Sequence, residues 1–323
     1  MKAGVSFSLK DDEEVMQDSI LIVGPGAIGG LLAAKAAACG QTVYLLSSSS
    51  VSERGIAQKG LPVKNVSGPI KIVRKNIVSA RAFGEKIPAS AVFFCVKRPD
   101  LLSAIAAAKK YIPQEAAILF LQNGIGHSKI ARAHFKEKNV VIGSCYFASE
   151  RTQDGVILHH GGDRLSLAKN LKNSAAVREF SRVLRRSGWD VVLEKSEEEM
   201  LWTKLCLNAA INPIGTLAKA ENGMIMRDPG LKKIALEALK EAISVARKFG
   251  PFISDKKMRA LLQKICPENS KQKNSTLQDI ENGRPTELGQ LLGPLFLCAK
   301  QKNIKTPILL RMFKMTQKLE SLR

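Results

Sequence analysis

The sequence predicts a Rossmann-type, doubly wound parallel α/β domain over residues 20–195, followed by an all-helical domain over residues 196–323. In the first half, short apolar runs alternate with segments of helical periodicity, which is typical of a parallel sheet covered by helices. The first apolar run leads directly into the motif Gly24-x-Gly26-x-x-Gly29. In the second half, helical periodicity dominates without a convincing strand, so helices alone are expected there.

The expected elements follow one another along the chain. Five mostly continuous apolar runs are expected to form strands buried on both faces: residues 20–24, 42–47, 91–97, 117–123 and 140–145. Helices are expected between them over 28–39, 101–111 and 126–137. The first half then closes with a small antiparallel addition over 155–160 and 164–169, a helix over 175–186 and a strand over 189–194. Helices of the second half are expected over 197–217, 231–249, 256–265, 286–300 and 307–319.

The charge balance is unusual, because 50 Lys and Arg residues against 29 Asp and Glu give a net charge of +21. Nucleic-acid binding is one explanation of such an excess. However, the basic residues are spread along the chain without a run of five or six like charges, and aromatic residues that would stack on bases make up only 5%. We therefore expect no nucleic-acid partner, and a positive field that attracts an anionic cofactor and an anionic substrate.

Cysteines, histidines and the N-terminus set further limits. The six cysteines form no C-x-x-C pair, and several lie in apolar runs, which indicates buried thiols in a reducing compartment and hence the cytoplasm. The four histidines lack metal-ligand spacing, so no metal is expected. Residues 1–19 carry acids and no apolar core, as in a loose extension rather than a signal peptide. The apolar stretch 20–34 is too short and too broken by Gly and Pro to span a membrane.

The glycine motif lies between a predicted strand and a predicted helix, the context in which it signals dinucleotide binding. Gly24 permits the tight turn, Gly26 lets the backbone approach a pyrophosphate, and Gly29 allows close packing of helix on strand. At Ala27 and Ile28 the helix begins, and its free N–H groups and partial positive charge suit phosphates. A glycine-rich turn between two buried elements is the structural alternative.

Cofactor choice depends on the end of the second strand. An NAD-binding protein would place an acid there, about 20 residues after the motif. Here the sequence is TVYLLSSSSVSERG, with Ser47 near that position and no acid before Glu53. Since a carboxylate would repel a 2′-phosphate whereas hydroxyls and Arg54 could hold one, we predict NADP (NADPH) as the cofactor. A polar loop with no discriminating role is the alternative.

Two further strands are expected to end in polar side chains, Lys97 in CVKRPD and Asn123 in LQNGIG. Open α/β sheets bind ligands at the carboxyl ends of their strands. Although a lysine at a strand end is often only solvated, the two residues align with the glycine motif, and we expect them to line the cofactor cleft.

In the second half, a narrow polar stripe crosses an apolar helix. Lys204, Asn208 and Asn212 follow one another at intervals of four, and apolar residues cover nearly all other directions. Such a helix is buried, and a buried lysine is costly unless it is paired. We therefore expect the stripe to face a cavity that holds a polar ligand, with a solvated stripe as the alternative. Pro213 is expected to kink or end the helix.

A second polar cluster follows near the C-terminus. Ser275 and Asp279 share one helix face, and Glu287 opens the next helix after the turn ENGRP. A carboxylate suits the positive end of a helix, so Glu287 is either an ordinary N-terminal charge or a functional acid.

With these motifs the chain resembles the ketopantoate reductases (2-dehydropantoate 2-reductases). The resemblance covers almost the whole chain after residue 19. It rests on the glycine motif, VK at Lys97, QNG at Asn123, KLxxNxxxNP over 204–213 and SxLQDxxxGRxTE over 275–287. It implies NADPH-dependent reduction of the 2-keto group of ketopantoate, which gives pantoate for pantothenate and coenzyme A synthesis.

The resemblance also implies roles for the residues of these motifs. Lys204 resembles the general acid, and Asn208 and Asn212 resemble partners of the substrate hydroxyl or carbonyl. Ser275 resembles the residue that holds the substrate carboxylate. Glu287 resembles an acid that hydrogen-bonds substrate or the lysine, next to the cofactor.

The chain departs from the family pattern at two positions. Many members have arginine where Ser47 stands, and many have asparagine where Gln272 stands. Reduction of another 2-keto acid and the reaction of an NADP-dependent 3-hydroxyacid dehydrogenase therefore remain alternatives. A non-catalytic NADP-binding protein is a third. The expected partner is a small 2-keto acid, and the helical half suggests a homodimer.

Overall fold

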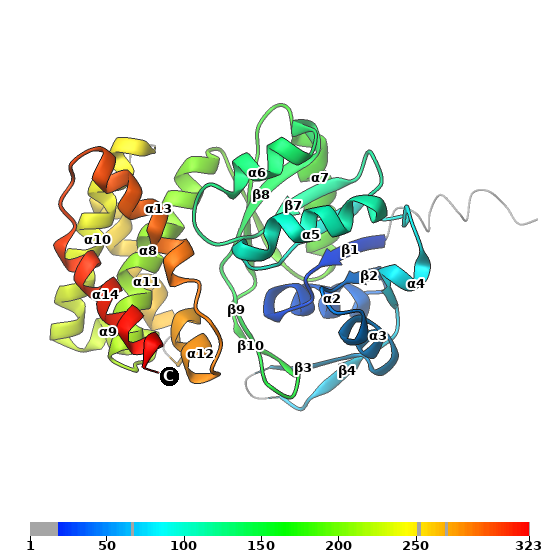
Figure 1. Ribbon diagram of the computed structural model, residues 1–323, viewed down its shortest axis with the longest axis horizontal. Coiled ribbons are helices and arrows are strands. Elements are labelled where there is room, and N and C mark those ends of the chain that lie inside the picture. The colour runs from blue at the N-terminus through cyan, green and yellow to red at the C-terminus, as the bar shows by residue number, and fades with distance from the viewer. Residues whose placement is uncertain (1–18, 66–67, 251–252, 269–270, 323) are drawn as a thin grey trace, which may run out of the picture.

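The computed structural model describes residues 19–65, 68–250, 253–268 and 271–322. Figure 1 shows an α/β domain beside a helical domain, so the predicted fold class is confirmed. The expected extension over residues 1–19 lies outside the described ranges except for Ser19, which begins the first strand.

An eight-stranded sheet forms the centre of the first domain, in the order β12-β11-β8-β7-β6-β1-β2-β5. The six strands from β8 to β5 are parallel, whereas β11 runs antiparallel to β8 and parallel to β12. Chain order reverses between β1 and β6, and ligands bind at such a switch point. The strands are β1 (Ser19–Val23), β2 (Thr42–Leu46), β5 (Ile77–Ser79), β6 (Ala91–Phe94), β7 (Ala117–Phe120), β8 (Val140–Cys145), β11 (Arg164–Ala168) and β12 (Asp190–Glu194).

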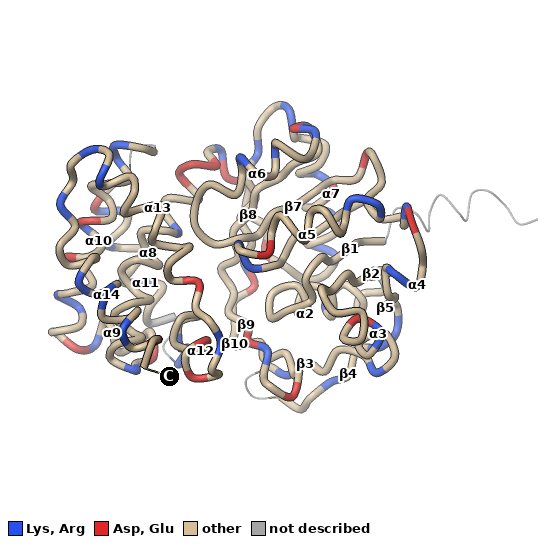
Figure 2. The backbone as a smooth tube through the Cα atoms, in the orientation of Figure 1, with Lys and Arg blue, Asp and Glu red and all other residues tan. Residues whose placement is uncertain are grey.

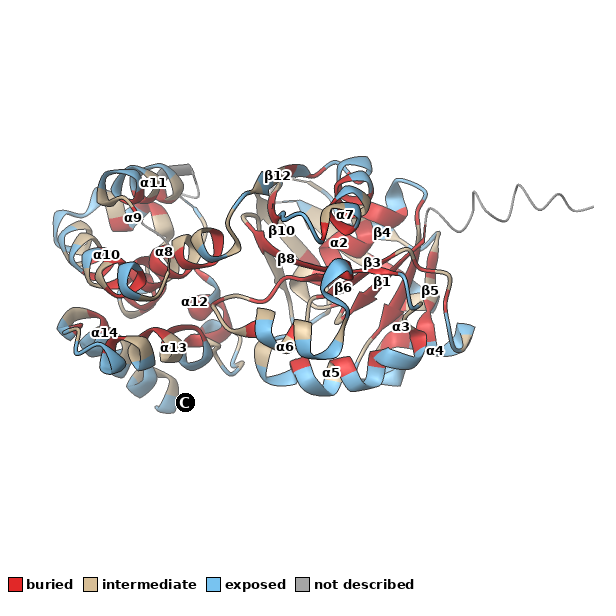
Figure 3. Cartoon of the chain, turned by 90° about the horizontal axis from the view of Figure 1, so that it is seen from above, coloured by how far each residue is buried: buried red, intermediate tan, exposed pale blue. Residues whose placement is uncertain are grey.

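The strands are continuous apolar runs because helices cover both faces of the sheet. Ile20 and Ile22 of β1 belong to a core shared with α2 (Ala27–Ala38) and α7 (Ser174–Arg186). Leu21 and Val23 point the other way, into a core shared with α5 (Leu101–Ala108) and α6 (His127–His134). Figure 3 shows the buried strands between these helices. The shorter helical segments are α3 (Ser50–Lys59), α4 (Ala80–Phe83), η1 (Arg98–Asp100), η2 (Lys109–Tyr111) and η3 (Glu137–Asn139).

A second, four-stranded sheet covers α2, in the order β4-β3-β10-β9. The predicted antiparallel addition over 155–160 and 164–169 is therefore only partly right. These segments do not pair with each other, because Gly161 and Gly162 turn the chain with positive φ and send β11 into the main sheet. The strands are β3 (Leu61–Asn65), β4 (Lys71–Val73), β9 (Ala148–Arg151) and β10 (Ile157–Gly161).

The second domain consists of helices around α8 (Glu197–Leu217). Ser196 caps the N-terminus of α8, where its side chain accepts a hydrogen bond from the Glu199 amide. The helix does not end at Pro213 but continues to Leu217. Its apolar residues form a core with the surrounding helices, as the composition of α8 predicts. These are α9 (Asn222–Arg227), α10 (Pro229–Phe249), α11 (Asp255–Glu268), α12 (Ser275–Glu281), α13 (Leu288–Gln301) and α14 (Pro307–Ser321).

Lys and Arg are spread over both domains in the orientation of Figure 2. Within the described ranges, no helix has both the length and the apolar character needed to cross a membrane.

Candidate active site

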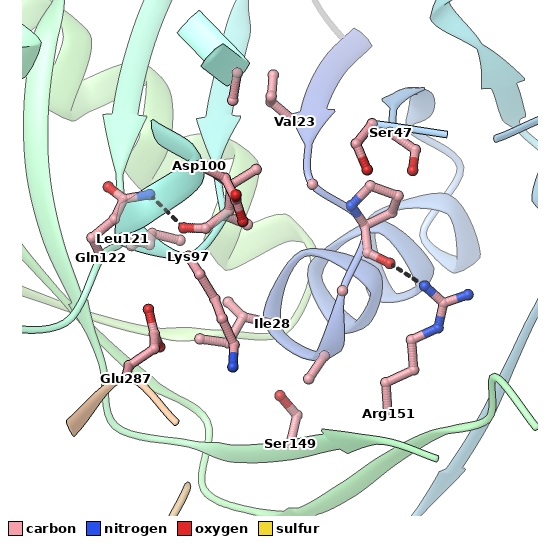
Figure 4. Close-up of a pocket in the computed structure, with 18 of the residues that line it drawn as sticks. Val23, Ile28, Ser47, Lys97, Asp100, Leu121, Gln122, Ser149, Arg151 and Glu287 are labelled. Carbon is pink, nitrogen blue, oxygen red and sulfur yellow. Dashed lines mark hydrogen bonds between the residues drawn. The ribbon is translucent and has the colours of Figure 1, made fainter. Parts of the chain in front are cut away.

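A cavity of about 620 Å³ lies at the carboxyl edge of the parallel strands, between the two domains. Loops after β1, β2, β6 and β7 line it on one side, and α12 and the start of α13 on the other. Figure 4 shows Ile28, Lys97 and Glu287 around this cavity. Most of the residues predicted from sequence line this cavity: Gly24, Gly26, Ala27, Ile28, Ser47, Lys97, Asn123, Ser275 and Glu287. Gly29 lies just behind the loop, and Arg54, Lys204, Asn208 and Asn212 are not part of the lining.

The glycine loop has the geometry that a pyrophosphate requires. Gly24 has φ +89°, and a Cβ there would lie 2.6 Å from Val96 Cγ1. By contrast, a Cβ at Gly26 would meet no protein atom within 4 Å, although this residue lines the cavity. Gly26 caps α2 without a side-chain hydrogen bond, and the first turn carries no acid. The amide groups at this helix end are thus open to an anion, and the loop fits a dinucleotide.

An acid lies near the end of β2 in the structure, although in the sequence it comes six residues after Ser47. Glu53 is fully buried, and its carboxylate accepts from the amides of Ser47 and Arg81, both at 3.0 Å. It also accepts from Ser79 Oγ at 2.5 Å and from the guanidinium of Arg81. Arg54 is exposed on α3, so Arg81 takes the place beside Ser47 where we expected Arg54.

A second arginine that we did not predict lies over the glycine loop. Arg151, at the end of β9, lines the cavity and donates from Nη1 to the carbonyl oxygen of Pro25 at 3.3 Å (Figure 4). Arg81 follows β5 and Arg151 is the last residue of β9, and neither short strand carries a distinctive motif. Their approach to the loop therefore depends on tertiary structure that the sequence pattern does not reveal.

Charged side chains connect the domains at the other end of the cavity. Lys97 Nζ donates to Asp279 Oδ2 at 2.9 Å and to the carbonyl of Pro285 at 3.2 Å. Asp279, only 8% exposed, also accepts from Arg284 Nε at 3.0 Å. The strand-end lysine expected on the cofactor side thus contacts the helical domain directly.

Glu287 lies at the N-terminus of α13 and accepts from the Arg98 amide at 3.3 Å. Burial raises the pKa of this carboxyl, and the charge of Lys97 opposes the shift only in part. The residue is therefore more than a solvated helix-end charge, since it lines the cavity and contacts the opposite domain.

Lys204 Nζ donates to the carbonyl oxygen of Cys145 at 2.7 Å, at the carboxyl end of β8. Burial lowers the pKa of this amine, and Cys145 and Glu287 oppose the shift. The amine is therefore not solvated on the outside of α8, although it does not line the cavity. Asn208 is half-buried and Asn212 is buried.

His127, which the sequence did not single out, is fully buried near these cations. Neither ring nitrogen has a hydrogen-bond partner among the described residues. Burial and the charges of Arg98, Lys204 and Arg132 lower its pKa to about 3, so the ring is neutral at physiological pH. Across the described ranges, no group of three or more His, Cys, Asp or Glu residues is placed to hold a metal ion.

A Rossmann domain faces a helical domain across this cavity, and this two-domain architecture is that of a nucleotide-binding protein with a second site opposite the nucleotide. Two family models match the chain: ketopantoate reductase PanE/ApbA over residues 20–171 and ketopantoate reductase PanE/ApbA C terminal over residues 196–320. The protein therefore belongs to the ketopantoate reductase family.

Individual proteins are similar to this chain in sequence or in fold. The 2-dehydropantoate 2-reductase of Halobacterium salinarum is 25% identical over 291 residues, which cover 90% of this chain and 95% of the relative. A structure of D-mandelate dehydrogenase with NADH and anilino(oxo)acetate has a TM-score of 0.85 at 20% identity, and the match covers 94% of this chain and 98% of the other. The dimeric ketopantoate reductase of Staphylococcus aureus has a TM-score of 0.76 at 21% identity, with 94% and 99% covered. At these identities the two structures show a shared fold alone.

Proposed function

We propose that the protein reduces ketopantoate to pantoate with NADPH, for pantothenate and coenzyme A synthesis. One observation carries the proposal: a single cavity joins the glycine loop of the first domain to Ser275 and Glu287 of the second. A nucleotide held by the loop and a 2-keto acid held by the helical domain would thus meet in one place. The name of the Halobacterium salinarum relative supports the same reaction.

When bound, the nicotinamide supplies a hydride for the keto carbon. The amides at the start of α2 would hold the pyrophosphate, and Lys97 and Asn123 would line the rest of the cofactor cleft. Ser275, which is exposed in the lining, would hydrogen-bond the substrate carboxylate. Lys97 would add charge attraction for either anion, since it retains 42% exposure despite its bond to Asp279.

Lys204 is the proposed general acid, which protonates the oxygen at C2 as negative charge develops there. An amine whose pKa is lowered from 10.5 gives up its proton more readily than an exposed lysine. Glu287 opposes that shift and so helps to keep the amine charged before reaction. Asn208 and Asn212, on the same helix face, would hydrogen-bond the substrate hydroxyl or carbonyl.

The test is an absorbance assay at the nicotinamide band with ketopantoate and either NADPH or NADH. Lys204→Met should lower kcat by about 10²- to 10⁴-fold, the range for loss of a general acid. The dissociation constant for NADPH should stay within about twofold, because the amine contributes to the proton transfer rather than to the nucleotide site. Lys240→Met on the exposed side of α10 is the matched control. Nearly unchanged turnover of Lys204→Met would contradict the assignment.

The alternatives are separated by the same assay. A reductase of another 2-keto acid, or a 3-hydroxyacid dehydrogenase, would turn over 2-ketoisovalerate or a 3-hydroxyacid faster than ketopantoate. A non-catalytic NADP-binding protein would bind NADPH and oxidise it with none of them. We further propose a domain boundary at 195/196, a cytoplasmic location and a homodimer, the last supported by the dimeric relative from Staphylococcus aureus.

A further inference from the structure

The wall of the cavity at the end of β2 contains a guanidinium that no family motif predicts. β5 lies beside β2 in parallel register, with Leu45 opposite Ser79. Arg81 follows β5 by two residues, so it emerges at the same edge of the sheet as Ser47, which follows β2 by one. Its Nη2 donates to the carbonyl oxygen of Ser47 at 2.8 Å. Ser47, Ser48 and Arg81 all line the cavity.

The carboxylate of Glu53 lies close to this wall but is unable to contact a ribose. Both oxygens of Glu53 are used by four hydrogen bonds, from Ser47, Ser79 and twice from Arg81. The residue is 0% exposed and does not line the cavity. Glu53 therefore cannot select NAD by binding the ribose hydroxyls, because its carboxylate points into the protein and is paired with Arg81.

The same pair fixes the arginine in place. The side chain of Arg81 keeps 33% exposure although Glu53 holds one end of its guanidinium. Bonds to Glu53 and Ser47 account for two of its N–H donors, and a guanidinium has five. An immobilised, planar donor of this kind suits a phosphate better than a mobile lysine, because less side-chain freedom is lost on binding.

We propose that Arg81, positioned by the buried Glu53, is the residue that recognises the 2′-phosphate of NADPH, together with the hydroxyls of Ser47 and Ser48. The proposal rests on the proposed function to the extent that the cofactor is a nicotinamide dinucleotide bound at the glycine loop. It assigns cofactor selection to the end of β5, whereas the sequence suggested Arg54 on α3. Glu53 is a positioning residue and touches no ligand.

Two adenine nucleotides test the proposal without any turnover. Isothermal titration of the full chain would compare 2′,5′-ADP, which carries the 2′-phosphate, with 5′-AMP, which lacks it. The wild type should bind 2′,5′-ADP about 10- to 100-fold more tightly, as expected for hydrogen bonds to a charged group. Arg81→Gln should abolish that preference and leave 5′-AMP affinity within about twofold, while the control Arg54→Gln should change neither.

Arg81→Gln leaves Glu53 buried without its cation and so could unfold. The double variant Glu53→Gln with Arg81→Gln removes both charges, and retained 5′-AMP binding reports that it is folded. It should lose the preference in the same way. Full preference for 2′,5′-ADP in a folded variant without Arg81, or no preference in the wild type, would overturn the proposal.

The outcome is separable from that of the proposed function. A chain that shows the Arg81-dependent preference but reduces no 2-keto acid keeps this inference and refutes the proposed function. A chain that reduces ketopantoate equally well with NADH and NADPH supports ketopantoate reduction and refutes the role of Arg81.

Discussion

Alanine substitutions at Gly29 and Gly26, three residues apart, should have opposite consequences. A Cβ at Gly29 would lie 2.3 Å from the carbonyl oxygen of Gly24 and 2.9 Å from Cys95 Cβ. Overpacking costs about 1–3 kcal/mol, and the upper end applies because the first obstacle is backbone that cannot change rotamer. At about 2–4 °C per kcal/mol for a domain of this size, Gly29→Ala should lower Tm by about 6–12 °C.

Gly26→Ala meets none of these obstacles, because a Cβ there has no protein atom within 4 Å. Its φ of −79° is open to any residue, so the free energy of unfolding should change by less than about 1 kcal/mol. The added methyl group would occupy the space through which a pyrophosphate approaches the backbone. Affinity for NADPH should therefore fall by at least about tenfold, or 1.4 kcal/mol.

Thermal unfolding followed by circular dichroism, without ligand, measures the first effect, and fluorescence titration with NADPH measures the second. Each variant is the control for the other, since both change glycine to alanine within one motif. If Gly26→Ala lost as much stability as Gly29→Ala, the distinction between a packing glycine and a ligand-facing glycine would be wrong.

Two further predictions concern carboxylates. Glu287→Gln should raise the free energy of unfolding at pH 7. Burial raises the pKa of Glu287 above its usual 4.5, so ionisation of this carboxyl destabilises the folded state as the pH rises from 4.5 through the folded pKa. Glutamine does not ionise and avoids this loss. In urea unfolding, the free energies of unfolding of the wild type and Glu287→Gln should become equal below pH 4.5. A difference between them that grows as the pH is lowered would contradict this prediction. Glu241 accepts from the amides of Ile308 and Leu309 at 3.0 and 2.9 Å, at the start of α14. Glu241→Gln should therefore cost about 1 kcal/mol in urea unfolding, and the exposed Glu237→Gln on the same helix less than about 0.5; equal costs would argue against the capping role.

The sequence predicts the central sheet and the helix α8 because most of their side chains are buried. Strands with apolar residues on both faces, such as β1 and β7, appear as continuous apolar runs in the sequence, so they can be predicted without knowing which strands pair with them. The helix α8 is apolar nearly all round for the same reason. The second sheet escapes prediction because β3, β4 and β9 are short and half-exposed, so their residues show neither a continuous run nor a clear alternation.

The site is predictable where a motif carries the chemistry and unpredictable where only folding brings residues together. The glycine loop, Lys97 and Glu287 belong to motifs, and the cavity contains them. Motif membership alone is not sufficient, since Lys204, Asn208 and Asn212 of KLxxNxxxNP do not line the cavity. Arg81 and Arg151 come from the ends of β5 and β9, and nothing in their local sequence indicates a ligand. The expectation that Arg54 holds a phosphate depended on its nearness to Ser47 in sequence, whereas Arg81 comes near Ser47 because β5 pairs with β2 in the sheet.

Net charge explains less of this site than the pairing of individual groups does. The chain carries +21, yet two cations of the cavity wall are each matched by a carboxylate, Arg81 by Glu53 and Lys97 by Asp279. At one end the carboxylate is fully buried and the guanidinium is held at the wall. At the other end Asp279 binds Lys97 and Arg284 together, so an anion that enters there must compete with it. Arg81 can bind an anion while Glu53 still holds it, because the guanidinium keeps further N–H donors and remains partly exposed. We therefore expect the anion selectivity of this cavity to come from Arg81 rather than from Lys97.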